Sequence, residues 1–407
     1  MNGLLLNRIQ KWGRDGAAPS RSPSAAPGNA TRGWRVNPGA ICSARSARAG
    51  TAQRAVPPIF RKGSLRNSAL ILFGLLLPAI LRAAENVAPV AENHPLFRWA
   101  DATRLGRPLS KDPSVVRFGG RYLMYFSLPP FGTELAQTNA PKGWNIGIAE
   151  STNLVDWKKT GELLPAQACD ANGLCAPGAR VLDGNVHLFY QTYGNFPKDA
   201  ICHAVSADGI HFVRDASNPV FHPTGEWNNG RAIDAEVIPE GDRLLLYFAT
   251  RDAAGVTQML GVASAPLRSD YSRETWTQVC DRPILKPELA WETRCIEAPA
   301  IAKRGDTLVM FYAGGFNNDP QQIGVATSRD GVRWERQSHL PLLPNGAAGE
   351  WNSSESGHPG FFADDDGRSY LFFQGNNDRG KTWHLSCAEL EWKGSTPQFK
   401  KQNSTHP

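Results

Sequence analysis

Short apolar runs rich in aromatic residues recur five times along the chain, each just after a turn that contains Gly, usually beside Asp. These runs are Leu123–Phe126, His187–Tyr190, Leu245–Phe248, Leu308–Tyr312 and Tyr370–Phe373. A second apolar run follows each of them, at Ile146–Ala149, Ile201–Ala204, Leu260–Ala263, Ile323–Ala326 and Leu385–Ala388. A strand, a Gly-containing turn and another strand form a hairpin, so the pattern predicts repeated antiparallel strands.

A fourth strand is expected in four of the repeats, around Trp157, Phe212, Trp276 and Trp334. Four short strands that recur at intervals of about 60 residues, without helical periodicity, are typical of propeller blades. We therefore predict an all-β protein, a five-bladed β-propeller over residues 94–393. The fifth repeat has only three strands before a polar tail at 394–407, so we expect residues 95–103 to supply its outer strand and close the ring.

The segment before the propeller has a different composition. Residues 1–60 are rich in Ala, Arg, Ser, Pro and Gly and lack periodic apolar positions, which predicts a disordered basic leader. Residues 61–84 contain basic residues, an apolar run from Ala69 to Leu81 and the pair Ala83–Ala84, which is the order of a secretory signal peptide. A signal so far into the chain indicates a later translation start. We expect a secreted or periplasmic protein with no stable membrane insertion after cleavage.

The net charge of +6 is unevenly distributed and argues against a nucleic-acid partner. Residues 1–84 hold 13 of the 44 Lys and Arg residues but only one of the 38 acidic residues, Asp15. The remaining chain is therefore mildly acidic, whereas a nucleic-acid site needs a basic patch on the folded domain.

The first strand of each repeat carries the candidate chemistry. Counting back 14 residues from Phe126, Tyr190, Phe248, Phe311 and Phe372 reaches Asp112, Ala176, Asp234, Glu297 and His358. Taken singly, each has an ordinary explanation, such as a turn at Asp112 or an ion pair between Asp234 and Arg231. Because inner strands line the axis of a propeller, we expect the three carboxylates and His358 to converge at one end of a funnel. Buried like charges destabilise a fold unless the site is used, which favours a catalytic role.

Three carboxylates without a Cys/His metal pattern suit glycoside hydrolysis, in which one carboxyl is ionised while another is protonated. The sequence resembles the family-43 glycoside hydrolases, five-bladed propeller enzymes that act mainly on arabinose- and xylose-containing polysaccharides. The segments that carry the resemblance are Lys111–Val116, Ile233–Glu236, Ile296–Pro299 and Ser356–Pro359. It implies a carbohydrate substrate and an inverting mechanism with Asp112 as general base, Glu297 as general acid, and Asp234 orienting the acid.

His358 matches the family's axial histidine, which organises water or, in some members, a calcium ion. Here the continuation Pro359-Gly-Phe-Phe departs from the family's more polar sequence. We expect that no cofactor is required. The one metal that the resemblance suggests is a calcium ion near His358.

Related propellers offer alternatives. Fructan-cleaving enzymes are expected to carry Trp-Met-Asn-Asp-Pro, where this chain has Leu109-Ser-Lys-Asp-Pro113. Anhydrogalactosidases of red-algal galactans are expected to carry His immediately before the acid, where this chain has Ile296, so they are the runner-up. A carbohydrate-binding propeller without activity, or a structural propeller, remains the alternative from outside the enzymes.

Loops at the active face contain further candidates for binding sugar. Trp227, Trp291 and Trp351 precede inner strands and either stack on sugar rings or pack between blades. Loops after the second strands carry Tyr193, Phe196, Arg251, Asp252, Phe316, Asn317, Asn318 and Asn376. Of these, Arg251, Phe316 and Asn317, together with His358, are the predicted substrate contacts.

Six cysteines follow the leader, and an even number in an exported protein permits disulfides. Cys169 and Cys175 close a short loop and are the predicted pair. Cys202 and Cys387 fall within strand-like runs and are expected to be buried thiols.

Overall fold

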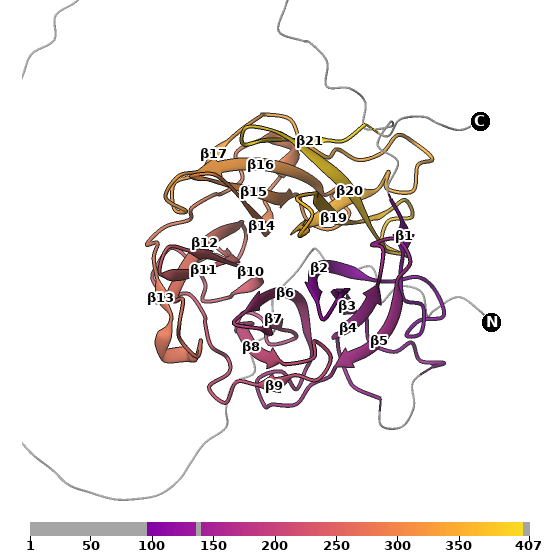
Figure 1. Cartoon of the computed structure of the whole chain (residues 1–407), viewed down its shortest axis with the longest axis horizontal. Coiled ribbons are helices and arrows are strands. Elements are labelled where there is room, and N and C mark those ends of the chain that lie inside the picture. Colours follow the sequence, from indigo (N-terminus) through magenta and orange to yellow (C-terminus); the bar gives the residue numbers. More distant parts are fainter. Residues whose placement is uncertain (1–95, 136–139, 402–407) are drawn as a thin grey trace, which may run out of the picture. The chain divides into compact units, whose positions relative to one another are not determined.

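The computed structural model of the protein describes residues 96–135 and 140–401, and this part is built almost entirely of strands. Five antiparallel sheets surround a central axis as the blades of a propeller, which confirms the predicted fold (Figure 1). The predicted leader 1–60 and signal peptide 61–84 lie outside the described residues.

The first four blades each contain four strands in chain order, from the axis outward. Blade 1 comprises β2 (Lys111–Phe118), β3 (Arg121–Leu128), β4 (Asn145–Ser151) and β5 (Lys158–Leu163). Blade 2 comprises β6 (Leu174–Leu182), β7 (Asn185–Thr192), β8 (Ile201–Ser206) and β9 (Val213–Arg214). Blade 3 comprises β10 (Ile233–Glu240), β11 (Arg243–Arg251), β12 (Gln258–Pro266) and β13 (Thr277–Gln278). Blade 4 comprises β14 (Ile296–Arg304), β15 (Thr307–Gly314), β16 (Gln322–Ser328) and β17 (Glu335–Arg336). Two short 3₁₀ helices, η2 (Arg273–Thr275) and η3 (Ala290–Glu292), lie in the connections.

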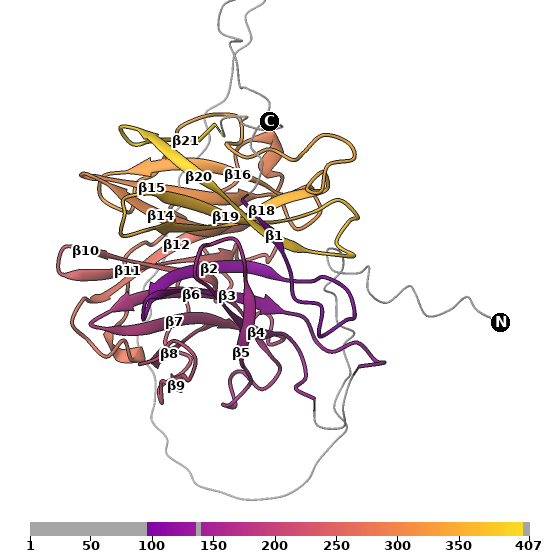
Figure 2. The ribbon, with the colours of Figure 1, turned by 45° about the vertical axis from the view of Figure 1, so that its right-hand side comes forward.

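Blade 5 is assembled from both ends of the domain. It comprises β18 (Glu355–Ala363), β19 (Ser369–Asn376), β20 (His384–Lys393), β1 (Arg98–Trp99) and β21 (Thr396–Phe399). β1 pairs antiparallel with β20 through Arg98 and Ser386, which confirms that the segment before blade 1 supplies the outer strand (Figure 2).

The strand β21 was not expected, since the sequence indicated only a polar tail after residue 393. β21 pairs with β20, after a turn at Gly394. In its four residues only Pro397 is buried and Phe399 is half-buried, so the strand is too short and too polar to give a clear alternation.

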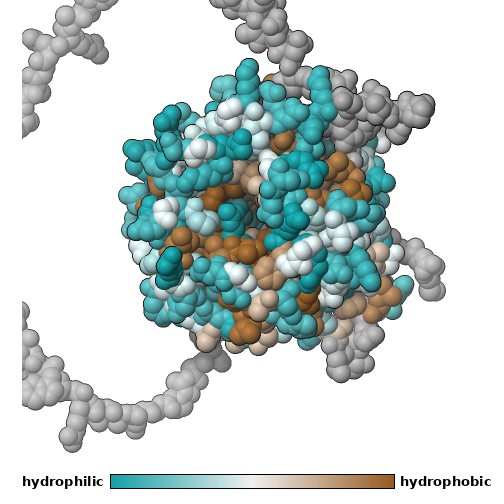
Figure 3. Space-filling model, in the orientation of Figure 1, coloured by the Kyte–Doolittle hydropathy of each residue, from teal (hydrophilic) through white to brown (hydrophobic). Residues whose placement is uncertain are grey.

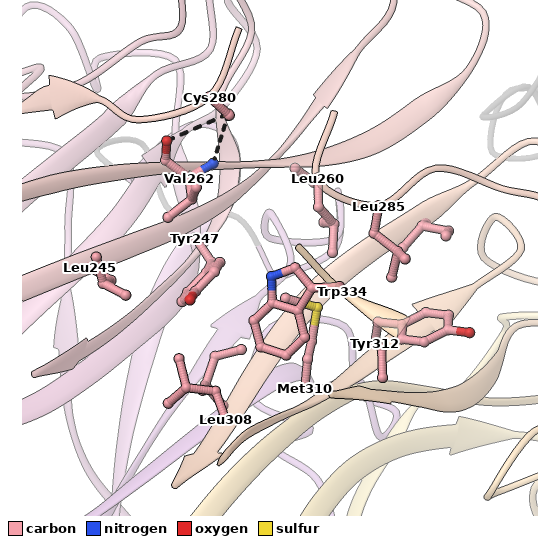
Figure 4. Close-up of a cluster of buried hydrophobic side chains, with 14 of the residues drawn as sticks. Leu245, Tyr247, Leu260, Val262, Cys280, Leu285, Leu308, Met310, Tyr312 and Trp334 are labelled. Atoms are coloured by element: carbon pink, nitrogen blue, oxygen red, sulfur yellow. Dashed lines mark hydrogen bonds between the residues drawn. The ribbon is translucent and has the colours of Figure 1, made fainter. Parts of the chain in front are cut away.

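The cores lie within and between blades. Figure 4 shows one of them, where Trp334 of blade 4 lies among side chains of blade 3, such as Tyr247, and of its own blade, such as Met310. The hydroxyl of Tyr247 donates to the carbonyl of Gly331 at 3.0 Å, and Tyr125 of blade 1 donates in the same way to Gly209 of blade 2 at 2.8 Å. These hydroxyl contacts join consecutive blades.

A hollow marks the centre of the face seen in Figure 3. An axial cavity of about 570 Å³ is lined by residues from the inner strands of all five blades, and Asp234 and His358 are among them. In the part of the chain that the structure describes, no helix has the length and apolar character needed to cross a membrane.

Candidate active site

Every inner strand is kinked at one point near its start. Pairing with the second strand shifts register there in all five blades. The residue at the kink has a positive φ of 45° to 56°, a conformation that non-glycine residues adopt mainly at functional or strained positions. The five kink residues are Asp112, Ala176, Asp234, Ala298 and His358. A bulge of this kind redirects a side chain, so the fold itself positions the carboxylates.

Glu297 does not occupy the position equivalent to Asp112, which corrects the count made from the sequence. Glu297 pairs with Ala313 before the register shift, as Lys111 pairs with Ser127, so Ala298 is the equivalent of Asp112. The reason lies in two adjacent aromatic residues of β15. The ring of Tyr312, not Phe311, covers the third-strand Gly324, just as Phe126 covers Gly147.

In blade 5 the count also started from the wrong aromatic residue, Phe372, but it still reached the correct kink residue, His358. Phe373 follows Phe372 directly, and Phe373 is the residue equivalent to Phe126. The turn of blade 5 is also longer, so the two differences cancel and His358 was located correctly.

Asp112, Asp234 and His358 form one buried cluster. His358 Nε2 lies 3.2 Å from Asp112 Oδ1 and 3.4 Å from Asp234 Oδ1, and all three residues are buried. Burial opposes the charge of His358, but Asp112 and Asp234 outweigh it and raise its pKa to about 9. The imidazole is therefore cationic at neutral pH and donates toward both carboxylates.

The two acidic residues expected to act as base and acid are driven in opposite directions. Burial opposes the ionisation of Asp112, but the cations of His358 and Lys111 and the hydroxyl of Ser127 lower its pKa below the ordinary value. Burial and the charge of Asp234 raise the pKa of Glu297, against the opposing effect of His358 and Lys111. One carboxyl thus favours the ionised form and the other the protonated form at the same pH.

Two glutamines hold the carboxyl of Glu297. Gln321 Nε2 donates to Oε1 at 2.7 Å, and Gln258 Nε2 donates to Oε2. Gln258 is in turn positioned by Arg251, whose Nε donates to its carbonyl oxygen at 3.1 Å. Donors on both oxygens stabilise the ionised Glu297 that remains once a proton has been given away.

A further acidic residue, which the sequence analysis missed, adjoins the site. Glu355 is fully buried and accepts from Gln374 Nε2 at 2.8 Å and from the backbone N–H of Asn318 at 2.6 Å. Burial raises its pKa to about 8 despite the nearby ammonium of Lys111. Lys111 lies over the ring of Trp383 at 4.7 Å and donates to Asn317 at 3.2 Å. Lys111 and Glu297 occupy equivalent positions, one residue before the kink of their strands. This equivalence marks Lys111 as a residue of the site, but it can be recognised only when the strand pairing is known.

Side chains of one blade also hold the kinked backbone of the next. Gln374 Oε1 accepts from the N–H of Asp112, and Gln191 Oε1 from that of Asp234, both at 3.0 Å. Ser127 Oγ accepts from the N–H of Ala176 at 2.8 Å. Gln191 and Gln374 directly follow the aromatic runs of their strands, and this recurrence is the sequence signal that could have identified them.

The three tryptophans predicted at the rim pack against the blades. Trp291 stacks on Tyr312 with ring centroids 5.9 Å apart, and Trp351 stacks on Phe373 at the same distance. Trp227 is half-buried and packs against two of the interblade cores. Each therefore contributes to blade packing, which was the alternative to sugar stacking, and contact with a sugar stays a prediction.

Arg251, Phe316 and Phe196, three of the residues that the sequence analysis named in the loops after the second strands, lie together, and their contact with a substrate stays a prediction. The guanidinium of Arg251 lies 5.3 Å from the ring of Phe196 and 5.4 Å from that of Phe316. Asn317 is exposed and accepts hydrogen bonds from Lys111 and Gln374, both at 3.2 Å. Arg251 also donates to Gln258, which holds Glu297, so Arg251 links the two rings to the carboxyl of Glu297.

The predicted pairing of Cys169 with Cys175 is not found. All six cysteines of the described residues are free, and the thiol of Cys169 lies 3.9 Å from that of Cys202 instead. Cys175 occupies the inner-strand position before the kink, where the charges of Asp112 and Asp234 add to burial in raising its pKa. It faces the axial site and not the loop that carries Cys169. Cys202 and Cys387 are buried, as predicted.

The residues around His358 do not fit a calcium ion. Calcium takes six to eight oxygen ligands, whereas His358 is itself the protonated partner of both neighbouring carboxylates. Among residues 96–135 and 140–401 no group of three or more His, Cys, Asp or Glu side chains is arranged to hold a metal. No chemical step is therefore assigned to a metal here.

Comparison with known proteins places this geometry in a family. The model of the glycosyl hydrolases family 43 matches residues 106–397. No curated protein matches the chain in sequence.

Solved structures share the fold at low sequence identity. A thermostable family-43 glycoside hydrolase is 19% identical, with a TM-score of 0.57 over 73% of this chain and 95% of its own. An endo-1,4-beta-xylanase from Bacteroides thetaiotaomicron is 22% identical, with a TM-score of 0.56 over 72% of this chain and 94% of its own. An alpha-L-arabinofuranosidase from Lactobacillus brevis is 16% identical, with a TM-score of 0.56 over 79% of this chain and all of its own. Because the family match spans most of the propeller, the chain belongs to glycosyl hydrolase family 43 and is a glycoside hydrolase.

Proposed function

We propose that the protein is an exported, inverting glycosidase that releases arabinofuranosyl or xylosyl units from plant or algal polysaccharide-derived sugars. The observation that carries the mechanism is the opposed tuning of two buried carboxyls. His358 and Lys111 favour the ionised form of Asp112, while burial and Asp234 favour the protonated form of Glu297. Inversion requires a base and an acid that hold these different states at one pH.

In the proposed reaction, Asp112 takes a proton from a water molecule as the oxygen of that water attacks the anomeric carbon. Glu297 donates its proton to the glycosidic oxygen, and the bond between that oxygen and the anomeric carbon breaks. Gln258 and Gln321 stabilise the carboxylate left on Glu297, since each donates to one of its oxygens. Proton exchange with solvent then restores both groups. The reaction needs no cofactor.

Asp234 and His358 act as positioning residues in this proposal. Asp234 raises the pKa of Glu297 by like charge, and the His358 cation contacts both Asp112 and Asp234 and offsets the repulsion between them. Without the cation, the like charges of two carboxylates in a buried site would repel one another.

The sugar class is supported by the family and by what its structural relatives are named for, an arabinofuranosidase and a xylanase. Export is supported by the signal-like sequence of residues 61–84. We infer a secreted or periplasmic enzyme whose partner is a carbohydrate.

The test is hydrolysis of a panel of substrates followed by proton NMR. The panel comprises aryl α-L-arabinofuranoside, β-D-xyloside and galactosides, with agar- and carrageenan-derived oligosaccharides. Turnover of the arabinofuranoside or xyloside, with the first-formed sugar in the opposite anomeric configuration, is expected. Activity on red-algal oligosaccharides alone would support the anhydrogalactosidase alternative. A protein that binds sugars but turns over none would be a binding propeller, and retained configuration would contradict the mechanism.

A further inference from the structure

Two thiols of blade 2 lie close together although the chain separates them by 33 residues. Cys169 belongs to the connection between β5 and β6, and Cys202 is the second residue of β8. Their sulfur atoms are 3.9 Å apart. A disulfide has a sulfur–sulfur distance of about 2.05 Å, so a small movement of the loop would bring them into bonding range.

The two thiols differ in access and in acidity. Cys202 is fully buried, whereas Cys169 is half-buried and can be reached by a small molecule. The contact with Cys202 lowers the pKa of Cys169 to about 7, so a large part of it is thiolate at neutral pH. The same contact, with burial, raises the pKa of Cys202 and keeps its proton in place.

The loop that carries Cys169 also supports the active face. Asn195 Nδ2 donates to the carbonyl of Cys169 at 2.9 Å, and Asn172 donates to Asn195 at 2.8 Å. Asn195 is followed by Phe196, against which the guanidinium of Arg251 lies. Fixing Cys169 would therefore fix the base of the loop that carries Phe196.

We propose that Cys169 and Cys202 form a disulfide, by exchange with a small-molecule disulfide such as oxidised glutathione, that fastens the connection between blades 1 and 2 to strand β8. The bond replaces the predicted link between Cys169 and Cys175. It is independent of the catalytic roles proposed above, because neither cysteine belongs to the acid and base machinery.

The exchange takes place in two steps. The Cys169 thiolate attacks one sulfur of oxidised glutathione, which forms a mixed disulfide and releases the other half as a thiolate. That thiolate takes the proton of Cys202, whose sulfur is no longer held by an anionic neighbour. The Cys202 thiolate then attacks the Cys169 sulfur and expels the second glutathione. Two protein thiols are oxidised, and one glutathione disulfide is reduced to two thiols.

The bond closes a loop of 33 residues and so removes conformational entropy from the unfolded chain. For a domain of this size the expected rise in Tm is about 3–6 °C. The Cys202→Ser variant should show no such rise, and it should retain a glutathione on Cys169 because the resolving thiol is absent.

The experiment uses the full chain, reduced and then incubated with oxidised glutathione at several ratios to reduced glutathione. Free thiols are alkylated, and peptides are mapped by mass spectrometry without reduction. We expect a peptide pair that joins Cys169 to Cys202, together with the rise in Tm. The control is Cys280→Ser, whose thiol hydrogen-bonds to Val262 in blade 3 and can be replaced by a hydroxyl. This variant should keep both the cross-link and the rise.

Three results would overturn the proposal. One is complete alkylation of Cys169 and Cys202 at every glutathione ratio. Another is a cross-link between Cys169 and Cys175. The third is an equal change in Tm in the wild type and in Cys202→Ser.

Discussion

Replacing His358 by Asn should move the whole pH–activity profile to higher pH. Asn is neutral, and it tolerates the positive φ of 48° at this position better than most residues do. Asp112 must be ionised to act as base, and losing the cation raises its pKa, so the acidic limb moves up. Glu297 must be protonated to act as acid, and the same loss raises its pKa, so the alkaline limb also moves up.

The size of the shift follows from the geometry. Unit charges 3.2 Å apart, in a medium of effective dielectric about 20, interact by about 5 kcal/mol, which corresponds to an upper limit of about 4 pKa units. Asp112 and Asp234 share the cation of His358, and the pKa of a carboxyl beside a cation is usually lowered by about 1–3 units. We therefore expect an upward shift of about 1–2 pH units in the acidic limb.

The assay is kcat/KM for an activated aryl glycoside between pH 4 and 10, because this ratio reports the ionisations of the free enzyme. His384→Asn is the matched control. His384 lies in the same blade, and burial lowers its pKa, so it is neutral at neutral pH and its loss should leave both limbs in place. A His358→Asn profile with reduced height but unchanged limbs would refute the electrostatic role and leave only a structural one.

Two further changes test the same electrostatics and the packing beneath it. Lys111→Met should move the acidic limb of the kcat/KM profile up by about one pH unit, less than His358→Asn does, because Lys111 lowers the pKa of Asp112 less than His358 does. An acidic limb that does not move would contradict this. Gly360→Ala should lower Tm by about 2–6 °C in thermal unfolding, because the added Cβ would lie 2.3 Å from the carbonyl oxygen of Pro113 in the neighbouring blade. Gly132→Ala is the control, since its Cβ would have no contact under 3.5 Å and Tm should not fall. Equal effects of the two substitutions would show that the close approach at Gly360 is unimportant.

The propeller was predictable because each repeat contains a strong local sequence pattern. An aromatic run after a Gly turn identifies each second strand, and the closing role of β1 follows from counting strands. The strand β21 could not be found in this way, since four residues with a single buried side chain leave no measurable alternation.

Asp112, Asp234 and Glu297 were identified from the sequence, but the register of Glu297 and the presence of Glu355 were not. The count from Phe311 reached Glu297 although Ala298 is the equivalent residue, because two adjacent aromatic residues both suit a buried strand. Which ring covers the glycine of the third strand depends on how the strands pair, and the sequence of one strand alone does not determine this pairing. The electrostatic effect of Glu355 on Lys111 likewise depends on how blades 1 and 5 lie against one another.

The rim tryptophans illustrate a different limit. The sequence around Trp227 and Trp351, a repeated Gly-Glu-Trp-Asn, would be the same for a sugar platform and for a residue that fills a gap between strands. Packing between strands depends on a small residue beneath the ring. Gly314 and Gly375 leave space in which Trp291 and Trp351 pack closely, and this fact depends on the tertiary structure.

The assignment of Glu297 as acid and Asp112 as base is tested most directly by the dependence of kcat/KM on the leaving group. Glu297→Gln and Asp112→Asn are compared with the wild type on a series of aryl glycosides whose phenols differ in pKa. Glu297→Gln should lose activity steeply on poor leaving groups and little on activated ones, which need scarcely any protonation. Asp112→Asn should lose activity to a similar extent on all of them. Equal sensitivity to the pKa of the leaving group in the two variants would contradict the assignment.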